Sequence, residues 1–427
     1  MQISKQNRLV LLINVVIAFF FLSILSLKGG HNFSPILLMV LGLGYVIYAS
    51  IKKWKFNLSK EDYLLIFSYI FYFSVFLLSF LTNSGKMREL DNPSRVILLI
   101  PTLILLLRTP IRIELLLLAM PLGSFIAGSV ALYDRVIIGN TMAFAPRTMH
   151  IQGGDISMSL GMFSLAIALF FAQKTRWKLT ALCVVSAFFG ILGSFLSTAR
   201  GGWIALPIGL IAMFWIYRQS LPKSFFIGIF SLLIISIIGL SKMPNSLVVE
   251  RIEQAQQNIH LYFNESNGNT SLGARFDMWK SALIMAKEKP ILGWGTQGAE
   301  AQRKEHAKSK IISNMAGNFN HAHNQYLDDL SKRGLLGLIA LLVILFIPLY
   351  SFKQHLKKFK FTEQHNESVI NTQLFATLGI VHILLVIFYC LSQGFFTHNS
   401  GNIFYFFLII LFYAVMKQTE KQFEKRA

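Results

Sequence analysis

His323 lies near the end of the longest polar segment of the chain, shortly before a long apolar run. Asn324 follows it directly, Gly334 comes after nine further residues, and Gly337 lies three positions later. An imidazole has an ordinary pKa of about 6.5, so it can take up or release a proton near neutral pH. The glycines allow a close approach of chain or ligand. His323 is therefore a candidate acid–base group, although a solvated loop histidine beside two helix ends would show the same pattern.

Two arginines could bind an anion. Arg200 is followed by two glycines in a very short turn between apolar runs, where exposed backbone amides would also attract negative charge. Arg275 comes four residues before Trp279, near the start of a predicted helix. A guanidinium binds phosphate through a planar fork that is often bidentate. The alternatives are an interfacial Arg200 that reaches toward lipid headgroups and an Arg275 that only stacks on Trp279.

Arg147 and His150 lie in an earlier loop and are weaker candidates for contacting a substrate. His321 and His323 are two residues apart, so on a helix their side chains would point in different directions. No convincing cluster of carboxylates accompanies them, whereas metal sites need several ligands at suitable spacing. The sequence therefore predicts neither a metal site nor a cofactor.

The elements that must position these residues are apolar helices. Of the 427 residues, 54% are hydrophobic and 14% are charged, whereas soluble proteins have about 25% charged residues. Runs of roughly 17–25 apolar residues are long enough to cross a bilayer. We therefore predict an all-α polytopic membrane protein with about twelve spanning helices. The predicted runs are at about 9–27, 34–51, 62–82, 94–108, 112–133, 156–173, 178–198, 203–217, 225–241, 335–352, 371–393 and 402–416. The fourth contains Pro101 and should be kinked.

Basic residues indicate the orientation of these helices. The loops on one predicted side hold 21 Lys and Arg residues, whereas the short loops on the other side hold seven. Because Lys and Arg accumulate in cytoplasmic loops, both termini are predicted to lie in the cytoplasm. The long polar segment then lies outside, in the periplasm of a Gram-negative cell. The net charge of +20 does not indicate nucleic-acid binding, because the basic residues are mostly spread over short loops.

The predicted runs divide the chain into three parts. Residues 1–241 hold the first nine spanning helices, residues 242–334 form a large periplasmic loop, and residues 335–427 hold three more spans and a basic cytoplasmic tail. Apolar residues recur at helical spacing in the loop, and its second helix should end before Pro290. These amphipathic helices are expected to lie on the membrane plane or to cap the bundle. A loop of this length with its own helices is usually functional.

Together, the candidate residues place two arginines and a histidine on the outer face of the membrane. Arginines suit a diphosphate, and a histidine suits removal of a proton from a hydroxyl group. The periplasm offers no ATP or nucleotide sugar, so a transferase there needs a donor that was activated in the cytoplasm. A sugar linked to a polyprenyl diphosphate, carried across the membrane on its lipid, meets this requirement.

The segment around His323 resembles the signature of the O-antigen ligase family. That signature is a His, then Asn, Ser or Gln, nine residues, a Gly, two residues, and Gly, Thr or Tyr. His323, Asn324, Gly334 and Gly337 match it at every fixed position. The superfamily also includes O-antigen polymerases and bacterial protein O-oligosaccharyltransferases.

Two further segments resemble the same superfamily. Arg200 matches its arginine in a short turn, and Arg275 with Trp279 matches its loop arginine ahead of a tryptophan. One segment departs from the pattern. Many members carry Asn-Pro-Asn where this chain has residues 152–158, so any substrate contact there is left open.

The resemblance implies an inverting, metal-independent glycosyltransferase of the GT-C type in the bacterial inner membrane. It would move polymeric O-antigen from undecaprenyl diphosphate to a sugar hydroxyl of lipid A-core and so complete lipopolysaccharide. Arg200 and Arg275 would hold the diphosphate, and His323 would act as the base or orient the acceptor. Further substrate contacts are expected from Asn324, Gly334, Gly337, Arg147 and His150.

Other functions remain open at this stage. An O-antigen polymerase or a protein O-oligosaccharyltransferase would use the same lipid-linked donor and differ only in the acceptor. A flippase or transporter for lipid-linked sugars would also have many spans, but it should carry charged residues inside them. The centres of the predicted spans hold almost no charged residues, which makes transport the weakest alternative.

Overall fold

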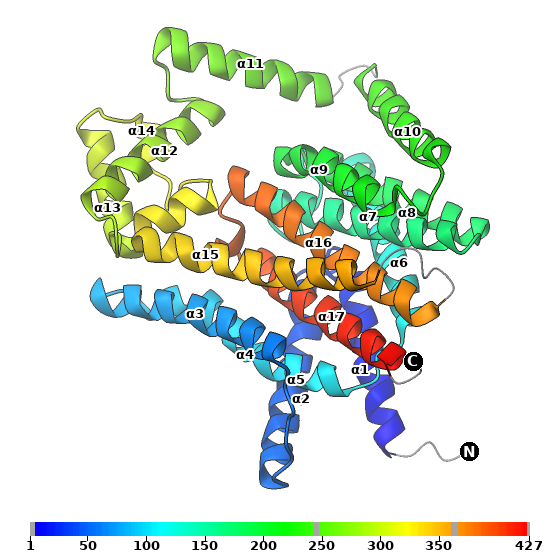
Figure 1. Cartoon of the computed structure of the whole chain (residues 1–427). Helices are drawn as coiled ribbons and strands as arrows, with labels where there is room; N and C mark the ends of the chain where they lie inside the picture. The colour runs from blue at the N-terminus through cyan, green and yellow to red at the C-terminus, as the bar shows by residue number, and fades with distance from the viewer. Residues whose placement is uncertain (1–4, 243–246, 360–365, 425–427) are drawn as a thin grey trace.

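The computed structural model describes residues 5–242, 247–359 and 366–424, so the end of the predicted basic tail lies outside the description. Every regular element in these ranges is helical, as the predicted fold class requires (Figure 1). The helices of at least 8 residues are α1 (Lys5–Ser23), α2 (Gly30–Ile51), α3 (Lys60–Thr82), α4 (Asp91–Leu98), α5 (Ile100–Arg108), α6 (Ile113–Leu132), α7 (His150–Gln173), α8 (Trp177–Leu196), α9 (Arg200–Tyr217), α10 (Lys223–Ser241), α11 (Leu247–Glu265), α12 (Ser271–Glu288), α13 (Gly295–Lys308), α15 (Gln325–Lys358), α16 (Glu367–Ser392) and α17 (Asn399–Glu424). Short turns are η1 (Met87–Leu90), η2 (Tyr133–Ile137), α14 (Asn314–Gly317) and η3 (Phe395–Thr397).

Ten helical segments in the described ranges are long and apolar enough to cross a membrane. They coincide with ten of the twelve predicted runs. The other two runs correspond to α1 and α10, whose described apolar stretches, Asn7–Ser23 and Lys223–Leu232, are shorter. The run with Pro101 is divided between α4 and α5, as the proline predicted. An all-α polytopic membrane protein is thus confirmed, with ten helical segments in the described residues that are long and apolar enough for a span.

Helices α7, α16 and α17 form the centre of the bundle. In their most apolar windows, 100%, 78% and 94% of the residues are buried. A helix that is apolar on all sides is one that other helices surround. Small residues allow close packing here: a Cβ on Gly190 of α8 would lie 2.7 Å from the amide nitrogen of Gly161 in α7. The ends of these central helices give the candidate site a rigid base.

Helices α12, α13 and α14 lie at one end of the long helices α3 and α15, whereas the C-terminus lies near the opposite end (Figure 1). Helix α12 ends before Pro290 as predicted, and a turn at residues 290–292 follows it. The three helices enclose a small apolar core of their own. It consists of Ala274, Met278, Ala307, Ile312 and Ala316.

Candidate active site

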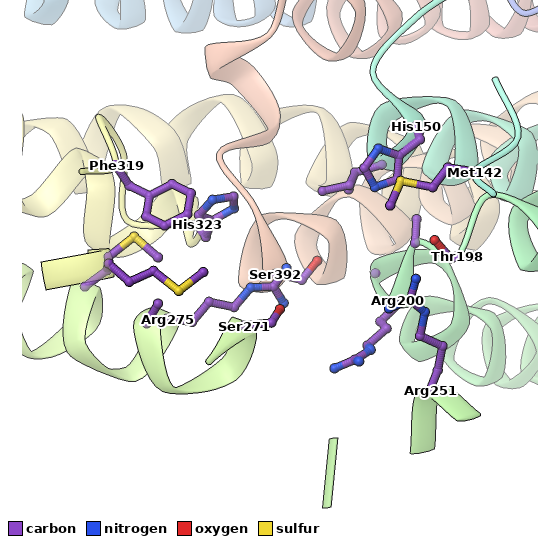
Figure 2. Close-up of a pocket in the computed structure, with 16 residues that line it drawn as sticks. Met142, His150, Thr198, Arg200, Arg251, Ser271, Arg275, Phe319, His323 and Ser392 are labelled. Carbon is purple, nitrogen blue, oxygen red and sulfur yellow. The ribbon is translucent and has the colours of Figure 1, made fainter. Parts of the chain in front are cut away.

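One cavity of about 260 Å³ brings together four of the eight predicted site residues, namely His150, Arg200, Arg275 and His323. Its walls come from the starts of α7 and α9, from α11 and α12, from the loop before α15 and from the end of α16. Figure 2 shows His323 and Arg275 on one side of the cavity and Arg200 with Arg251 on the other. None of the described lining residues is an Asp or Glu. They are Met142, His150, Ile151, Thr198, Ala199, Arg200, Gly201, Arg251, Ser271, Ala274, Arg275, Met278, Met315, Phe319, His323 and Ser392.

Arg200 is the first residue of α9 and follows a sharp change in chain direction. Thr198 has a φ of +63°, and Ala199 precedes the helix without a side-chain hydrogen bond to it. Gly201 permits close contact with α16, because an added Cβ would lie 2.6 Å from the hydroxyl oxygen of Ser392. This tight turn brings the partly buried side chain of Arg200 to the cavity wall.

Arg275 lies one turn into α12 and also lines the cavity. Burial, followed by the positive charge of Arg200, lowers the pKa of its guanidinium. The indole of Trp279 has a different partner: its Nε1 donates to the carbonyl oxygen of Ala322 at 3.1 Å. Arg275 therefore faces the cavity, while Trp279 holds the loop that carries His323.

The loop of residues 318–324 is fixed by hydrogen bonds from the helices around it. His323 has a φ of +47°, a conformation that is uncommon for residues other than glycine. Such a backbone persists when surrounding contacts hold it. These contacts come from α12, α13 and α15. Besides the Trp279 bond, they are Arg303 Nη1 to the Phe319 carbonyl oxygen at 2.8 Å, Lys332 Nζ to the Asn320 carbonyl oxygen at 2.9 Å, and the Ala322 amide to Asp328 Oδ1 at 3.0 Å.

The imidazole of His323 is neutral at physiological pH. Burial, then the charges of His321, Arg275 and His398, lower its pKa to about 3. Its Nδ1 is buried and has no hydrogen-bond partner among the described residues. A neutral imidazole can accept a proton, and an anion bound beside Arg275 would counter the charges that lower its pKa. Anion binding would thus bring the pKa closer to the range in which a general base works best.

The rings of His321 and His323 lie close together, with centroids 4.1 Å apart. The expectation that they point apart assumed a helix, whereas both residues lie in an irregular loop. Burial lowers the pKa of His321 to about 4. Two neutral imidazoles in contact avoid the repulsion that two protonated rings would create.

The other signature residues lie outside the cavity lining and shape the start of α15. Asn324 is the N-cap of this helix, and its side-chain oxygen accepts a backbone N–H at 3.1 Å. Gly334 has a φ of +61°, and a Cβ there would lie 2.3 Å from the carbonyl carbon of Ile291. A Cβ on Gly337 would lie 2.5 Å from that of Arg333. The glycines thus allow a close approach of the chain itself, and they define the kink that follows the histidine loop.

The structure separates Arg147 from His150. His150 begins α7 and lines the cavity. Arg147 is not among the lining residues, and its Nη1 lies 2.6 Å from both carboxylate oxygens of the buried Asp134. Asp134 also accepts the amide N–H of Phe144 at 2.9 Å. Arg147 therefore stabilises the loop before α7.

The segment that departs from the Asn-Pro-Asn pattern, residues 152–158, is buried and directly follows His150 and Ile151 of the cavity lining. Asp155 accepts hydrogen bonds from the side-chain amide of Gln393 and from the backbone N–H of Gly202. Gln152 Nε2 donates to the carbonyl oxygen of Phe395 at 3.3 Å. These contacts join α7 and α9 to the end of α16, and they support the turn that presents Arg200.

Sequence reasoning missed most of the other residues of the cavity wall, among them the polar residues Arg251 and Ser392. Arg251 belongs to the amphipathic helix α11 and to none of the recognised motifs. Its only signal was a basic residue on a predicted helix of the large loop. Ser392 ends α16, which the sequence identified only as a spanning run.

Comparison with known proteins supports the assignment of these residues to one family. A family profile described as O-Antigen ligase matches residues 185–342, a range that contains Arg200, Arg275 and His323. An uncharacterized protein of Haemophilus influenzae is 41% identical over 408 residues, which cover 96% of this chain and 99% of that protein. This chain therefore belongs to the O-antigen ligase family.

Proposed function

We propose that this protein is an O-antigen ligase. It would transfer polymeric O-antigen from undecaprenyl diphosphate to lipid A-core and so complete lipopolysaccharide. One observation carries the proposal: a single cavity holds the neutral imidazole of His323 and the guanidinium groups of Arg200 and Arg275, and no carboxylate is among its described lining residues. Family membership and the apolar helices around the site support a lipid-linked glycan as the donor.

The arginines act on the diphosphate of the donor. Arg200 and Arg275 lie on opposite sides of the cavity, and neither forms an ion pair with a described residue. A diphosphate between them would receive charge-assisted hydrogen bonds from both forks. It would also relieve the repulsion between the two cations, which already lowers the pKa of Arg275.

His323 acts on the acceptor. The acceptor hydroxyl oxygen forms a bond to the anomeric carbon, while the bond from that carbon to the diphosphate oxygen breaks and its electron pair goes to the diphosphate. The hydroxyl proton moves to the imidazole and then to water. Attack from the side opposite the leaving group inverts the configuration at the anomeric carbon. The diphosphate beside Arg275 raises the basicity of His323, so donor binding prepares the base.

The reaction is placed on the periplasmic face of the inner membrane, with both termini in the cytoplasm. The bias of basic residues supports this orientation. The helix ends that this orientation assigns to the outside also converge on one cavity. Cysteines replacing the exposed Lys310 and Lys357 would test it with an impermeant thiol reagent in spheroplasts. Labelling at position 310 alone is expected, and labelling at 357 alone would reverse the orientation.

Lipopolysaccharide from a deletion strain tests the reaction itself. Loss of ligated polymer, with accumulation of lipid-linked polymer, identifies a ligase. Capping with a single repeat unit would identify a polymerase instead, and normal lipopolysaccharide with an unglycosylated protein substrate would identify a protein O-oligosaccharyltransferase. Complementation with the His323→Ala variant should fail. Lys304→Ala, which removes an exposed cation of α13 outside the cavity, should complement fully.

Metal independence is part of the proposal. No group of three His, Cys, Asp or Glu side chains in the described residues could hold a metal ion. The guanidinium groups would instead neutralise the charge of the leaving diphosphate. Transfer by the purified protein should therefore persist in excess EDTA. Activity that EDTA abolishes and magnesium or manganese restores would contradict this part of the mechanism.

A further inference from the structure

A third arginine, Arg251, lines the same cavity and belongs to neither the ligase signature nor the two recognised arginine segments. It lies in α11, and Figure 2 shows its side chain beside that of Arg200. Arg251 lies close enough to Arg200, and to His150 at the start of α7, for its positive charge to act on both side chains. One side of the cavity therefore carries a pair of neighbouring cations.

The guanidinium of Arg251 is only partly satisfied by the protein. Its Nη1 donates to the side-chain oxygen of Gln254 at 2.9 Å, and Gln254 Nε2 donates in turn to Glu250 at 2.8 Å. Its Nε is buried and has no hydrogen-bond partner among the described residues. Buried donors are normally paired, and for this Nε the described residues supply no partner. With Arg200 and Arg275, the cavity holds three cations, and its described lining offers no carboxylate.

Helix α11 is anchored well away from Arg251. At its C-terminal end, the Tyr262 hydroxyl donates to Asp277 Oδ1 at 3.0 Å, and the ring of Tyr262 lies 5.0 Å from that of Phe276. These contacts attach α11 to α12, the helix that carries Arg275. Arg251 thus reaches the cavity from an element that helps neither to build the histidine loop nor to form the turn at Arg200.

The chemistry of the proposed reaction explains why a third cation is useful. In the donor, the diphosphate is esterified at both ends and carries two negative charges. When the bond to the anomeric carbon breaks, the electron pair stays on the terminal phosphate oxygen and adds a third charge. The second pKa of a phosphate monoester is about 6, so much of this charge persists at neutral pH. The positive charges of the three arginines therefore balance the charge of the product diphosphate more closely than that of the donor.

We infer that Arg251 stabilises the negative charge that develops on the leaving diphosphate, and that it therefore binds the polyprenyl diphosphate product more strongly than the donor. The inference rests on the proposed function, because it assigns a role within that reaction. Interactions that strengthen in the transition state increase the rate of the chemical step, whereas equal binding of donor and transition state does not. Arg251 should accordingly affect transfer more than donor binding.

Two measurements on Arg251→Ala and Arg251→Lys test this role. The first is binding of undecaprenyl diphosphate, and of an intact lipid-linked donor, to the purified full-length protein in detergent. Arg251→Ala should weaken product binding at least roughly 10-fold and donor binding less than about 3-fold. The second is the single-turnover rate, which should fall roughly 10- to 100-fold in Arg251→Ala and less in Arg251→Lys. Lys304→Ala controls for loss of a positive charge from the same loop.

The outcomes separate this inference from the proposed function. Equal weakening of donor and product, or no weakening of either, overturns the role of Arg251. A product-selective loss in a protein that transfers no glycan to any acceptor would disprove the ligase activity and leave the diphosphate site standing. Undecaprenyl monophosphate serves as a third ligand: if Arg251→Ala weakens its binding as much as that of the diphosphate, Arg251 recognises any phosphate, and the inference fails.

Discussion

The two ends of α15 hold two charged clusters, and they differ in whether the basic groups have acidic partners. At its start, the cavity contains Arg200, Arg251 and Arg275, and its described lining contains no acid. At its end, three basic side chains surround Glu420. There His355 Nε2 lies 3.0 Å, Lys358 Nζ 2.7 Å and Lys417 Nζ 3.4 Å from Glu420 carboxylate oxygens.

This difference distinguishes a structural cluster from a ligand site. The basic groups around Glu420 have their counter-charges within the protein, and they join α15 to α17. The arginines of the cavity lie close enough to influence one another, yet no carboxylate is among the described residues of the wall. Like charges held together at a cost to stability are expected at functional sites. The cavity is therefore expected to lose function when it is altered, and the Glu420 cluster to lose stability.

The largest expected effect is that of His323→Ala on transfer. We expect the single-turnover rate to fall roughly 100- to 10,000-fold, which is the usual contribution of a positioned acid–base group. Donor binding should stay nearly intact, because the histidine acts on the acceptor proton. Donor binding and single-turnover kinetics measure the two separately. A variant that binds no donor but transfers what it does bind at the normal rate would make His323 a phosphate ligand.

Arg200→Lys should have the next largest effect, a loss of transfer of roughly 10- to 100-fold. A point charge replaces a bidentate fork, so part of this loss should appear as weaker donor binding. Lys358→Arg is the matched exchange at the other end of α15. It should leave both transfer and thermal stability nearly unchanged, because Lys358 only balances charge there. If Lys358→Arg lowered transfer as much as Arg200→Lys does, the distinction between the two clusters would be wrong.

Glu420→Gln should destabilise the protein but leave the rate of glycan transfer unchanged. It leaves the basic groups around a buried position without their shared partner, at a cost of about 1–3 kcal/mol. The melting temperature in detergent should fall, while the single-turnover rate at a permissive temperature is kept. Glu424, which is 53% exposed, is the control. Glu424→Gln should cost less than about 0.5 kcal/mol, as for other exposed ion pairs.

The smallest expected effect is a dependence of stability on pH from the histidine loop. Folding lowers the pKa of His321 to about 4 and that of His323 to about 3, against about 6.5 in the unfolded chain. Between these values the unfolded chain binds protons that the folded protein does not, so stability falls as the pH drops below about 6.5. The slope should be under about 1 kcal/mol per pH unit, because water reaches the cavity.

His321→Gln should flatten this slope, which melting curves at pH 7.5 and pH 5 would measure. His260 is exposed on α11 and serves as the control. If His260→Gln flattens the slope as much as His321→Gln does, the acid sensitivity does not come from the buried histidine loop.

Much of the fold could be predicted because membrane helices impose a strong constraint on sequence. A spanning segment must satisfy its own backbone hydrogen bonds and present apolar side chains over a fixed thickness, so each one is visible as a long run. The stop before Pro290 and the interruption at Pro101 were predictable for a similarly local reason, since proline lacks the N–H that a helix needs. These features depend on neighbours in the chain.

The site could be predicted only where the sequence resembled a known family. Arg200, Arg275 and His323 matched such patterns, and the structure places all three at one cavity. The signature glycines were also recognised. Their role in the kink of α15 depends on the turn at Ile291, which the sequence alone did not bring into contact with them.

Only the tertiary structure decided which remaining charges belong to the cavity. Arg147 and Arg251 are both basic residues in loops assigned to the same side, and their local sequences do not distinguish them. Arg147 meets the buried Asp134, whereas Arg251 reaches a wall with no described acid. The physical reason is that the state of a charge depends on which groups lie within a few ångströms of it. For both arginines, those groups come from helix packing.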